Sequence, residues 1–271
     1  MEPKKIHMIT LGCSRNRVDA EVMLGSLFEQ NWQNSTDPAN SDAVIVNTCG
    51  FIESAKEESI DTILEMSEYK KQNPNLKLVV AGCLTQRYKT QLAKGLPEVD
   101  LFIGTDEFSK IGHFLAQDQT GLELSEKIHA KRTHYLYNET LPRVNTLGKT
   151  SAYVKVAEGC QHNCAFCIIP AIRGKLRSRP VASVIKEAEQ LAKQGVKELN
   201  LIAQDLAAYG RDFENSPEMD AADLFMLLKE LVKVEGIDWI RMLYIYPENI
   251  TDEFLQFFAS EPKLVKYLDI P

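Results

Sequence analysis

Residues 160–167 read Cys160-Gln161-His162-Asn163-Cys164-Ala165-Phe166-Cys167, which places three thiols in a Cys-x3-Cys-x2-Cys spacing. An apolar, strand-like run precedes them, Tyr153-Val154-Lys155-Val156-Ala157. Three thiolates this close in sequence can face one metal centre. They suit an iron-sulfur cube with one open iron better than a structural zinc site, which usually takes four protein ligands. Half of a zinc site or a set of buried core cysteines is the alternative, but no second Cys or His pair follows at zinc-ribbon distance.

The same spacing, with Glu158-Gly159 before it and Phe166 within it, resembles the signature of the radical S-adenosylmethionine (SAM) enzymes. The resemblance implies that Cys160, Cys164 and Cys167 hold a [4Fe-4S] cluster and form the catalytic centre. Its free iron would bind the amino and carboxylate groups of the methionine part of SAM. Phe166 is a candidate cofactor-binding residue on the same ground.

The composition indicates a globular protein without a membrane segment. The chain has 271 residues, enough for one large or two ordinary domains, and it is 44% hydrophobic and 25% charged. No apolar run suits a signal peptide or approaches the roughly 20 residues of a membrane span, so we expect a cytoplasmic location. The six cysteines should then be reduced and act as ligands rather than disulfides. The net charge of −7 favours a basic protein substrate over a partner held by its phosphates.

Residues 1–120 alternate between strand-like and helical patterns. Apolar runs at 4–11, 42–48, 76–81 and 100–104 are separated by stretches with apolar residues at helical spacing. This alternation predicts an α/β fold with a doubly wound parallel sheet.

Three cysteines follow the ends of three of these strands. Because parallel strands end at the same edge of a sheet, Cys13, Cys49 and Cys83 are predicted to meet there as a second three-thiolate site. Each lies beside a glycine, which allows the backbone to approach a bulky cluster closely. Taken singly, each cysteine could also be a small buried hydrophobic residue.

Residues 121–148 lose periodicity and are interpreted as a linker, in which His129 and His134 are expected to be solvated loop histidines. Residues 149–271 resume the alternation, with strands predicted at 198–203, 239–245 and 267–271. Helices are predicted at 181–193, 223–234 and 251–259. This rhythm indicates a (β/α) barrel with its chemistry at the carboxyl ends of the strands. About four repeats cannot close a barrel, so we expect an incomplete radical SAM domain from a longer protein.

Four further residues are candidates for binding the cofactor. Gln204, Asp205 and Tyr244 fall at predicted strand ends, although a turn or core role is the alternative for each. Arg173 opens a dense cationic stretch that ends at Arg179, and guanidinium groups pair bidentately with carboxylates. A solvated charged turn is the alternative for that stretch.

The whole chain resembles the radical SAM methylthiotransferases, which join a three-cysteine α/β domain to a radical SAM half-barrel. The resemblance is carried by Leu11-Gly12-Cys13-Ser14-Arg15-Asn16, Asn47-Thr48-Cys49-Gly50-Phe51-Ile52, Ala81-Gly82-Cys83-Leu84, residues 158–167, Ile169-Pro170, Arg173-Gly174, Arg177-Ser178-Arg179 and Ala203-Gln204-Asp205 with Tyr209-Gly210. Ser14, Asn16 and Val18-Asp19 are similar to the branch called RimO, which modifies an aspartate of ribosomal protein S-12. The tRNA-modifying branch, MiaB, usually reads Gly-Cys-Gln-Met-Asn at this place.

The resemblance implies two [4Fe-4S] clusters and SAM as cofactors. Cys160, Cys164 and Cys167 would hold the cluster that cleaves SAM, and Cys13, Cys49 and Cys83 the one that carries or donates sulfur. The implied reaction adds a methylthio group to the β-carbon of the aspartate, either on S-12 alone or on S-12 within the ribosome. An electron donor such as flavodoxin or ferredoxin is also implied.

Two departures from the family pattern affect this interpretation. The family generally has a Thr pair after Gln-Asp, where this chain has Leu206-Ala207-Ala208. The small C-terminal β-domain called TRAM, which helps to grip the substrate, is absent from this sequence, so we expect weak substrate binding by the chain alone. Two alternative functions stay open: a tRNA adenosine methylthiotransferase, and a two-cluster iron-sulfur electron-transfer protein.

Overall fold

The structure, a computed structural model, describes residues 2–117, 121–132, 135–213 and 222–270. The chain forms two compact units, one of residues 1–135 with 141–144 and the other of residues 136–140 with 145–271. Each unit has its own parallel sheet and its own hydrophobic core. The prediction of an α/β chain with parallel sheets is confirmed.

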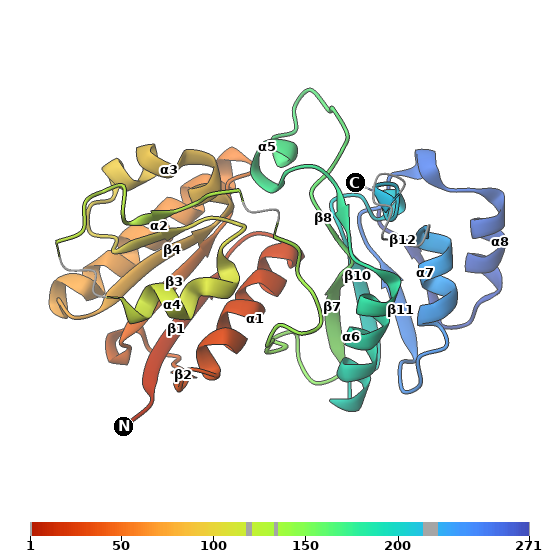
Figure 1. The fold of residues 1–271 in the computed structure, drawn as a ribbon, viewed down its shortest axis with the longest axis horizontal. Helices are drawn as coiled ribbons and strands as arrows, with labels where there is room; N and C mark the ends of the chain where they lie inside the picture. The colour runs from red at the N-terminus through yellow and green to blue at the C-terminus, as the bar shows by residue number, and fades with distance from the viewer. Residues whose placement is uncertain (1, 118–120, 133–134, 214–221, 271) are drawn as a thin grey trace. The chain divides into compact units, whose positions relative to one another are not determined.

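The first unit is built on a six-stranded sheet with the order β2-β1-β3-β4-β5-β6, all parallel (Figure 1). Its strands are β1 (Lys4–Thr10), β2 (Trp32–Asn34), β3 (Ala43–Thr48), β4 (Lys77–Gly82), β5 (Leu101–Ile103) and β6 (Ile128–His129). Its helices are α1 (Ser14–Phe28), α2 (Glu53–Gln72), α3 (Cys83–Gly95) and α4 (Ile111–Ala116).

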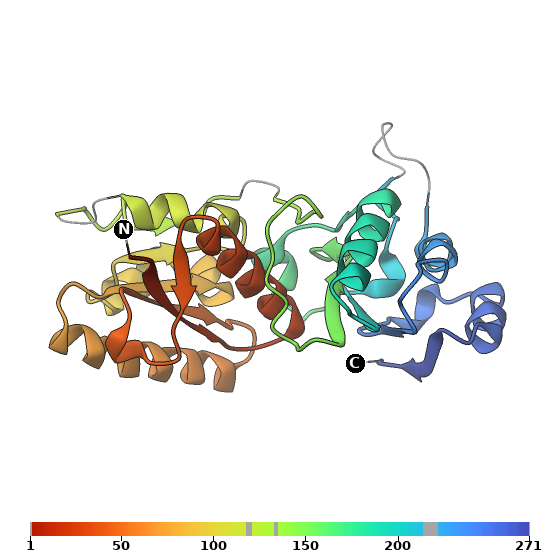
Figure 2. The ribbon, with the colours of Figure 1, turned by 90° about the horizontal axis from the view of Figure 1, so that it is seen from below.

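Helices cover both faces of this sheet, as in a doubly wound fold. Residues of α1 and α4 pack on one face, around Ile45 and Val79, and residues of α2 and α3 pack on the other, around Val46 and Val80. Figure 2 shows α1 (red) and α2 (orange) on opposite sides of the strands. Every residue of β3 is buried, which explains why its sequence begins with four consecutive apolar residues, 43–46, rather than an alternating pattern.

The second unit contains a four-stranded parallel sheet with the order β12-β11-β10-β7. These strands are β7 (Ser151–Lys155), β10 (Glu198–Ile202), β11 (Trp239–Met242) and β12 (Leu264–Leu268). A short antiparallel pair joins β8 (Ala157–Glu158) to β9 (Arg177–Ser178). The helices are α5 (Ile169–Arg173), α6 (Val181–Lys193), α7 (Leu224–Leu231) and α8 (Asp252–Ser260).

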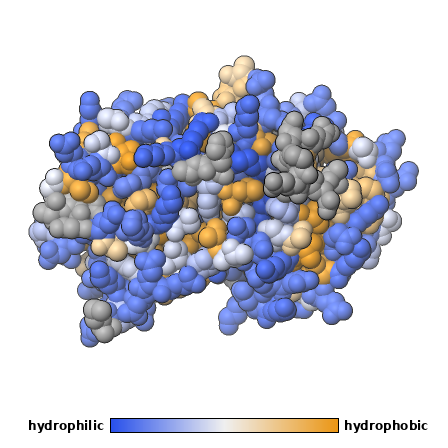
Figure 3. Space-filling view, viewed as in Figure 1, coloured by the Kyte–Doolittle hydropathy of each residue, from blue (hydrophilic) through white to orange (hydrophobic). Residues whose placement is uncertain are grey.

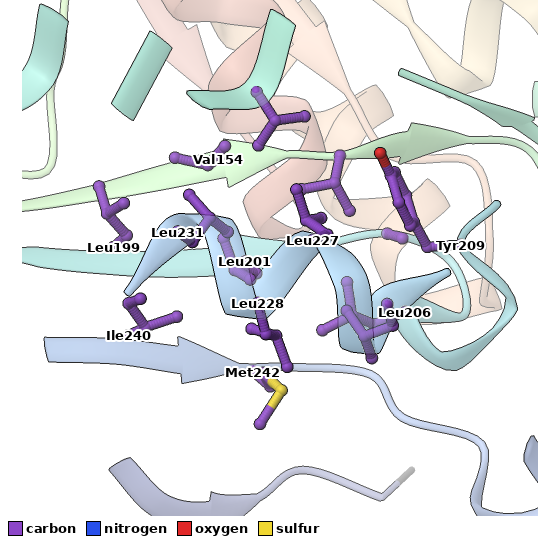
Figure 4. Packing of buried hydrophobic residues seen from close by; sticks show 14 of the residues in the cluster. Val154, Leu199, Leu201, Leu206, Tyr209, Leu227, Leu228, Leu231, Ile240 and Met242 are labelled. Carbon is purple, nitrogen blue, oxygen red and sulfur yellow. The ribbon is translucent and has the colours of Figure 1, made fainter. Parts of the chain in front are cut away.

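The core of the second unit lies between one face of this sheet and its helices. Figure 4 shows Leu227, Leu228 and Leu231 of α7 packed against apolar side chains of three neighbouring strands, namely Val154, Leu199, Leu201, Ile240 and Met242. The alternate residues of these strands, among them Glu198, Asn200 and Arg241, belong to the other face of the sheet. The sheet is open among the described residues, with β7 and β12 at its edges.

The structure differs from the sequence prediction at short or marginal elements. The sequence missed β2 and β6, because strands of three and two residues are too short for a periodic signal. The last strand was predicted at 267–271 but lies at Leu264–Leu268, where Leu264 anchors it in the core; Pro271 lies outside the described residues.

The segment 121–148, predicted as a linker, has more structure than expected. β6 extends the first sheet, Tyr137 is buried in the second unit, and Arg143 forms a buried ion pair with Glu21 in the first. The prediction that His129 is a solvated loop histidine is wrong, since its half-buried ring stacks on Phe114 with 3.9 Å between ring centroids. His134 lies outside the described residues.

The surface shown in Figure 3 is largely hydrophilic, with apolar side chains scattered between polar ones. Within the part of the chain that the structure describes, no helix is long and apolar enough to cross a membrane.

Candidate functional site

Three strand ends carry the cysteines of the first predicted site. Cys13 is the N-cap residue of α1, Cys49 directly follows β3, and Cys83 is the first residue of α3. The strands β1, β3 and β4 that lead to them are neighbours, with Thr10 paired to Asn47 and Thr48 paired to Gly82. The sheet therefore delivers all three loops to one edge.

The three cysteine loops also touch one another. A Cβ built on Gly12 would lie 2.8 Å from Cys49 Cβ and 3.2 Å from its Sγ. One built on Gly50 would lie 3.0 Å from the backbone of Cys83, and one built on Gly82 would lie 2.6 Å from Thr48 O. The glycines beside the cysteines are thus needed for contact between the loops, whereas the sequence suggested clearance for a cluster.

Two helix N-termini favour negative charge at this edge. Cys13 and Cys83 lie at the starts of α1 and α3, where the positive end of the helix dipole favours negative charge. Cys13 and Cys49 are half-buried and Cys83 is buried. Thiolates in this setting fit an anionic, cysteine-held cluster.

The second predicted site lies in the loop between β8 and α5. Cys160 N–H donates to Gly174 O at 3.1 Å, and Cys167 N–H donates to Cys164 O at 3.0 Å, which folds the cysteine loop back on itself. Burial raises the pKa of the Cys160 thiol, and the nearby Asp205, Cys167 and Cys164 raise it further. Cys164 is exposed, whereas Cys160 and Cys167 are half-buried.

Each cysteine of an iron-sulfur cube binds a different iron atom, so such ligands stay spread apart. Within the described ranges, no three His, Cys, Asp or Glu side chains lie together around a single metal-ion position.

Glu158 is the centre of a buried charged network beside the second cysteine loop. Its Oε2 lies 2.9 Å from Lys155 Nζ and 3.3 Å from Arg173 Nη1, and its Oε1 accepts from Gln204 Nε2 at 2.8 Å. Burial by itself would raise the pKa of Glu158, but Lys155 and Arg173 more than offset burial and hold that pKa well below its usual range. The network keeps Glu158 ionised and fixes the orientation of the Gln204 amide.

The Gln204 amide offers an unused acceptor. Because Nε2 donates to Glu158, the other end of the amide is Oε1, which is buried and has no hydrogen-bond partner among the described residues. A buried acceptor without a partner is costly, so a donor from a bound molecule would complete this site. An amino group such as that of SAM has the required chemistry.

Asp205, the next residue, organises the neighbouring loops. Its Oδ2 lies 2.7 Å from His162 Nε2, and its Oδ1 accepts from the backbone N–H of Ala207 at 3.0 Å and of Tyr246 at 3.2 Å. The His162 ring in turn contacts the Tyr246 ring, with 4.8 Å between centroids. Asp205 thereby holds the cysteine loop against the loop that follows β11.

The remaining candidates lie at different distances from this network. Arg173 belongs to it, and Tyr244 accepts a backbone hydrogen bond from Leu206 at 2.8 Å with its own φ at +64°. Phe166 is 87% exposed, so most of its ring faces solvent. The structure therefore brings together Arg173, Gln204 and Asp205, with Tyr244 beside them, and leaves Phe166 apart.

Sequence reasoning missed several residues that shape the two sites. The sequence pattern places Glu158 and His162 beside the cysteines and Lys155 in a strand, but it does not predict their roles. Arg87, whose Nη1 donates to Gly50 O at 2.7 Å, was not considered. The polar residues Lys155 and Glu158 inside an apolar run were the available signal, because buried charges need partners.

Comparison with known families supports two joined domains. Residues 5–104 match the family described as "Uncharacterized protein family UPF0004", and residues 154–270 match the radical SAM superfamily. The solved structure of the radical SAM methyltransferase TsrM from Kitasatospora setae, with cobalamin and a [4Fe-4S] cluster bound, aligns with a TM-score of 0.53 at 13% identity. That alignment covers 97% of this chain and 59% of TsrM, and it supports the fold alone.

Curated relatives match almost the whole chain. A protein of Citrifermentans bemidjiense is 47% identical over 99% of this chain, and one of Pelobacter propionicus is 47% identical over 100%. A third, from Myxococcus xanthus, is 47% identical over 99% of this chain. All three are named "Ribosomal protein uS12 methylthiotransferase RimO". The chain spans 58% of the first two relatives and 54% of the third. The resemblance predicted from the sequence is confirmed: over nearly its whole length the chain is similar to the RimO branch of the radical SAM methylthiotransferases.

Proposed function

We propose that this chain is the catalytic portion of a methylthiotransferase that adds a methylthio group to the β-carbon of an aspartate of ribosomal protein uS12. The observation that supports it most is the presence of two separate cysteine trios, one at three neighbouring strand ends and one in a single loop, on a chain 47% identical to RimO proteins over nearly its whole length. The substrate is the one that the relatives' name states.

Two trios of thiolates would each hold a [4Fe-4S] cluster. Cys160, Cys164 and Cys167 would ligate the one beside Gln204, and the trio at the sheet edge, Cys13, Cys49 and Cys83, would ligate the other. When bound, a cluster of the first kind supplies the electron that cleaves SAM reductively. The cluster held by Cys13, Cys49 and Cys83 would carry or donate the sulfur.

The chain's own residues would bind and orient the cofactor. The unpartnered Oε1 of Gln204 would accept a hydrogen bond from the amino group of SAM. Glu158 holds the amide in the orientation that presents this oxygen, and Lys155 with Arg173 keeps Glu158 charged. A preorganised acceptor costs little reorganisation when the ligand arrives.

Further partners follow from the proposed chemistry. Reductive cleavage requires a low-potential electron donor, such as flavodoxin or ferredoxin. The uS12 protein is made and assembled in the cytoplasm, where this enzyme would act.

The test is mass spectrometry of uS12 from cells that lack the gene. We expect the methylthio mark to be absent, and to return with the wild-type gene or with Glu189→Gln, a control at an exposed position of α6. Cys49→Ala and Cys164→Ala should not restore it. An unchanged mark on uS12 in the deleted strain, or loss of methylthio groups from tRNA adenosines instead, would refute the proposed substrate.

A further inference from the structure

Asn16 lies in the first turn of α1 and is 1% exposed. Its side-chain Nδ2 donates to two backbone carbonyls, Leu11 O at 3.1 Å and Thr48 O at 2.9 Å. Leu11 lies two residues before Cys13, and Thr48 lies directly before Cys49. One amide group therefore cross-links two of the three cysteine loops.

The same side chain reaches the third loop with its other end. Cys83 Sγ lies 3.5 Å from Asn16 Oδ1, at a distance typical of a weak hydrogen bond involving sulfur. Because both contacts of Nδ2 are to carbonyl oxygens, which only accept, the nitrogen and oxygen of the amide cannot be exchanged. Asn16 thus contacts all three cysteine loops, two of them through Nδ2 and the third through Oδ1, which accepts from Cys83 while that residue is a thiol.

Neighbouring groups hold Asn16 itself in place. Asn47 Nδ2 donates to Asn16 O at 2.7 Å, and Thr48 Oγ1 donates to Ala81 O at 2.6 Å, which ties the ends of β3 and β4 together. Gly12 leaves room for this arrangement, since a Cβ there would lie 3.3 Å from Asn16 Nδ2. The Asn16 side chain is buried, so its hydrogen bonds do not compete with bulk water.

We propose that Asn16 is a positioning residue of the first cysteine site, which sets the spacing of Cys13, Cys49 and Cys83 so that they accept one cluster. The inference rests on the proposed function, because it takes Cys13, Cys49 and Cys83 as the ligands of the cluster that would carry or donate sulfur. Residues that orient metal ligands from behind typically change metal affinity about 10–100-fold when they are removed.

The test uses a chain in which only the first site can bind iron, the triple variant Cys160→Ala, Cys164→Ala and Cys167→Ala. After anaerobic reconstitution, iron and sulfide are counted, the electron paramagnetic resonance spectrum of the reduced protein is recorded, and the rate of iron loss to a chelator is measured. In this background, Asn16→Ala should lose iron about 10–100-fold faster and show an altered spectrum. Asn16→Asp should lose iron at least as fast as Asn16→Ala, because its side chain turns an oxygen, instead of an N–H donor, toward the two carbonyls.

Two control variants separate positioning from general stability. Asn200→Ala makes the same chemical change at a buried position of β10 in the other unit. Ser67→Ala removes one buried hydrogen bond of α2, in the same unit as Asn16, and keeps every contact of the Asn16 side chain. Both should retain iron as the parent does, after comparison at equal fractions folded by circular dichroism. If Asn16→Ala does not fold, Asn16→Ser replaces it under the same criteria.

The outcomes distinguish this inference from the proposed function. A triple variant that binds no iron while Asn16 is intact would remove the first site, and the proposed function with it. If the triple variant binds iron and the addition of Asn16→Ala does not speed the loss of that iron, the positioning role of Asn16 is overturned. The proposed function is not affected by that result. Iron loss in Ser67→Ala as fast as in Asn16→Ala would also overturn the positioning role, since stability would then explain both.

Discussion

Single residues explain why the first cysteine site needs its glycines. The sequence identified the three cysteines and the glycine beside each one, because strand, glycine and cysteine recur three times. It could not show that Gly12 faces Cys49, since this contact joins loops from β1 and β3 that are far apart in the chain. The residues of the site were therefore predictable, whereas their mutual contacts depended on the fold.

Gly12→Ala should destabilise the first unit and weaken iron binding at its cysteine site. Gly12 has a φ of +85°, and a left-handed conformation costs an alanine about 1–2 kcal/mol before any steric clash. The added Cβ would also lie 2.8 Å from Cys49 Cβ, so one of the two loops must move. Thermal unfolding and iron retention measure the two effects. Gly95→Ala is the matched control, because a Cβ at Gly95 has no neighbour within 4 Å; an equal effect of both substitutions would contradict the account.

His129 should make the first unit less stable in mild acid. Burial lowers its pKa from the ordinary 6.5; nearby Glu107 opposes the shift, and Lys131, His113 and Lys110 add to it. With the folded-state pKa below the unfolded-state pKa, the unfolded chain takes up the proton first, so stability falls as the pH drops below about 6.5.

The test for His129 is a comparison with His129→Phe, which can keep an aromatic contact with Phe114 but cannot be protonated. Unfolding midpoints are measured from pH 8 to pH 5. The wild type should lose more stability than the variant over this range, and parallel curves would show that His129 does not titrate as described.

Secondary-structure elements were predictable in proportion to their length and burial. The long buried strands β3 and β4 were predictable from their apolar runs. Helices α6 and α7 were predictable from apolar residues at helical spacing. The edge strands β2 and β6 gave no such signal. The segment 136–144 was also missed, because its anchors are single side chains, Tyr137 and Arg143, whose partners lie elsewhere in the chain.

Tyr137→Phe should destabilise the second unit. The Tyr137 hydroxyl donates to Glu187 Oε1 at 2.6 Å, and Glu187 also pairs with the fully buried Arg179. Phenylalanine keeps the ring under Arg179, whose guanidinium carbon lies 4.7 Å from the ring centroid, but leaves the carboxylate one donor short. The expected loss in unfolding free energy is about 1–3 kcal/mol.

Chemical denaturation of Tyr137→Phe measures this loss. Tyr267→Phe is the control, since Tyr267 is 51% exposed and its substitution should change little. A Tyr137→Phe protein as stable as the wild type would mean that the segment 136–140 is not anchored through this hydroxyl.

At the scale of the whole molecule, the two cysteine trios belong to different compact units. Chemistry at one trio should therefore survive loss of the other. Cys49→Ala should still produce 5′-deoxyadenosine from SAM under reducing conditions but should no longer transfer a methylthio group. Chromatography of the nucleoside products and mass spectrometry of uS12 measure these activities separately. Loss of SAM cleavage in Cys49→Ala would show that the two sites depend on each other.

The sequence predicted that each cysteine trio lies in its own unit, because each trio lies within one repeating pattern of strands and helices. The cofactor-binding details were only partly visible. Gln204 was placed at a strand end, but its dependence on Glu158 follows from a bond between residues 46 positions apart. Phe166, predicted from the resemblance alone, lies on the surface of this structure.

Counting iron and sulfide per chain, together with the electron paramagnetic resonance spectrum, tests the central claim most directly. The anaerobically reconstituted wild type should hold two clusters. A variant with Cys13, Cys49 and Cys83 all changed to Ala should keep about half of the iron and one of two spectral signals. The variant with Cys160, Cys164 and Cys167 changed to Ala should keep the other half and the other signal. Full iron content in the first variant, or none in either, would contradict the assignment of two separate clusters.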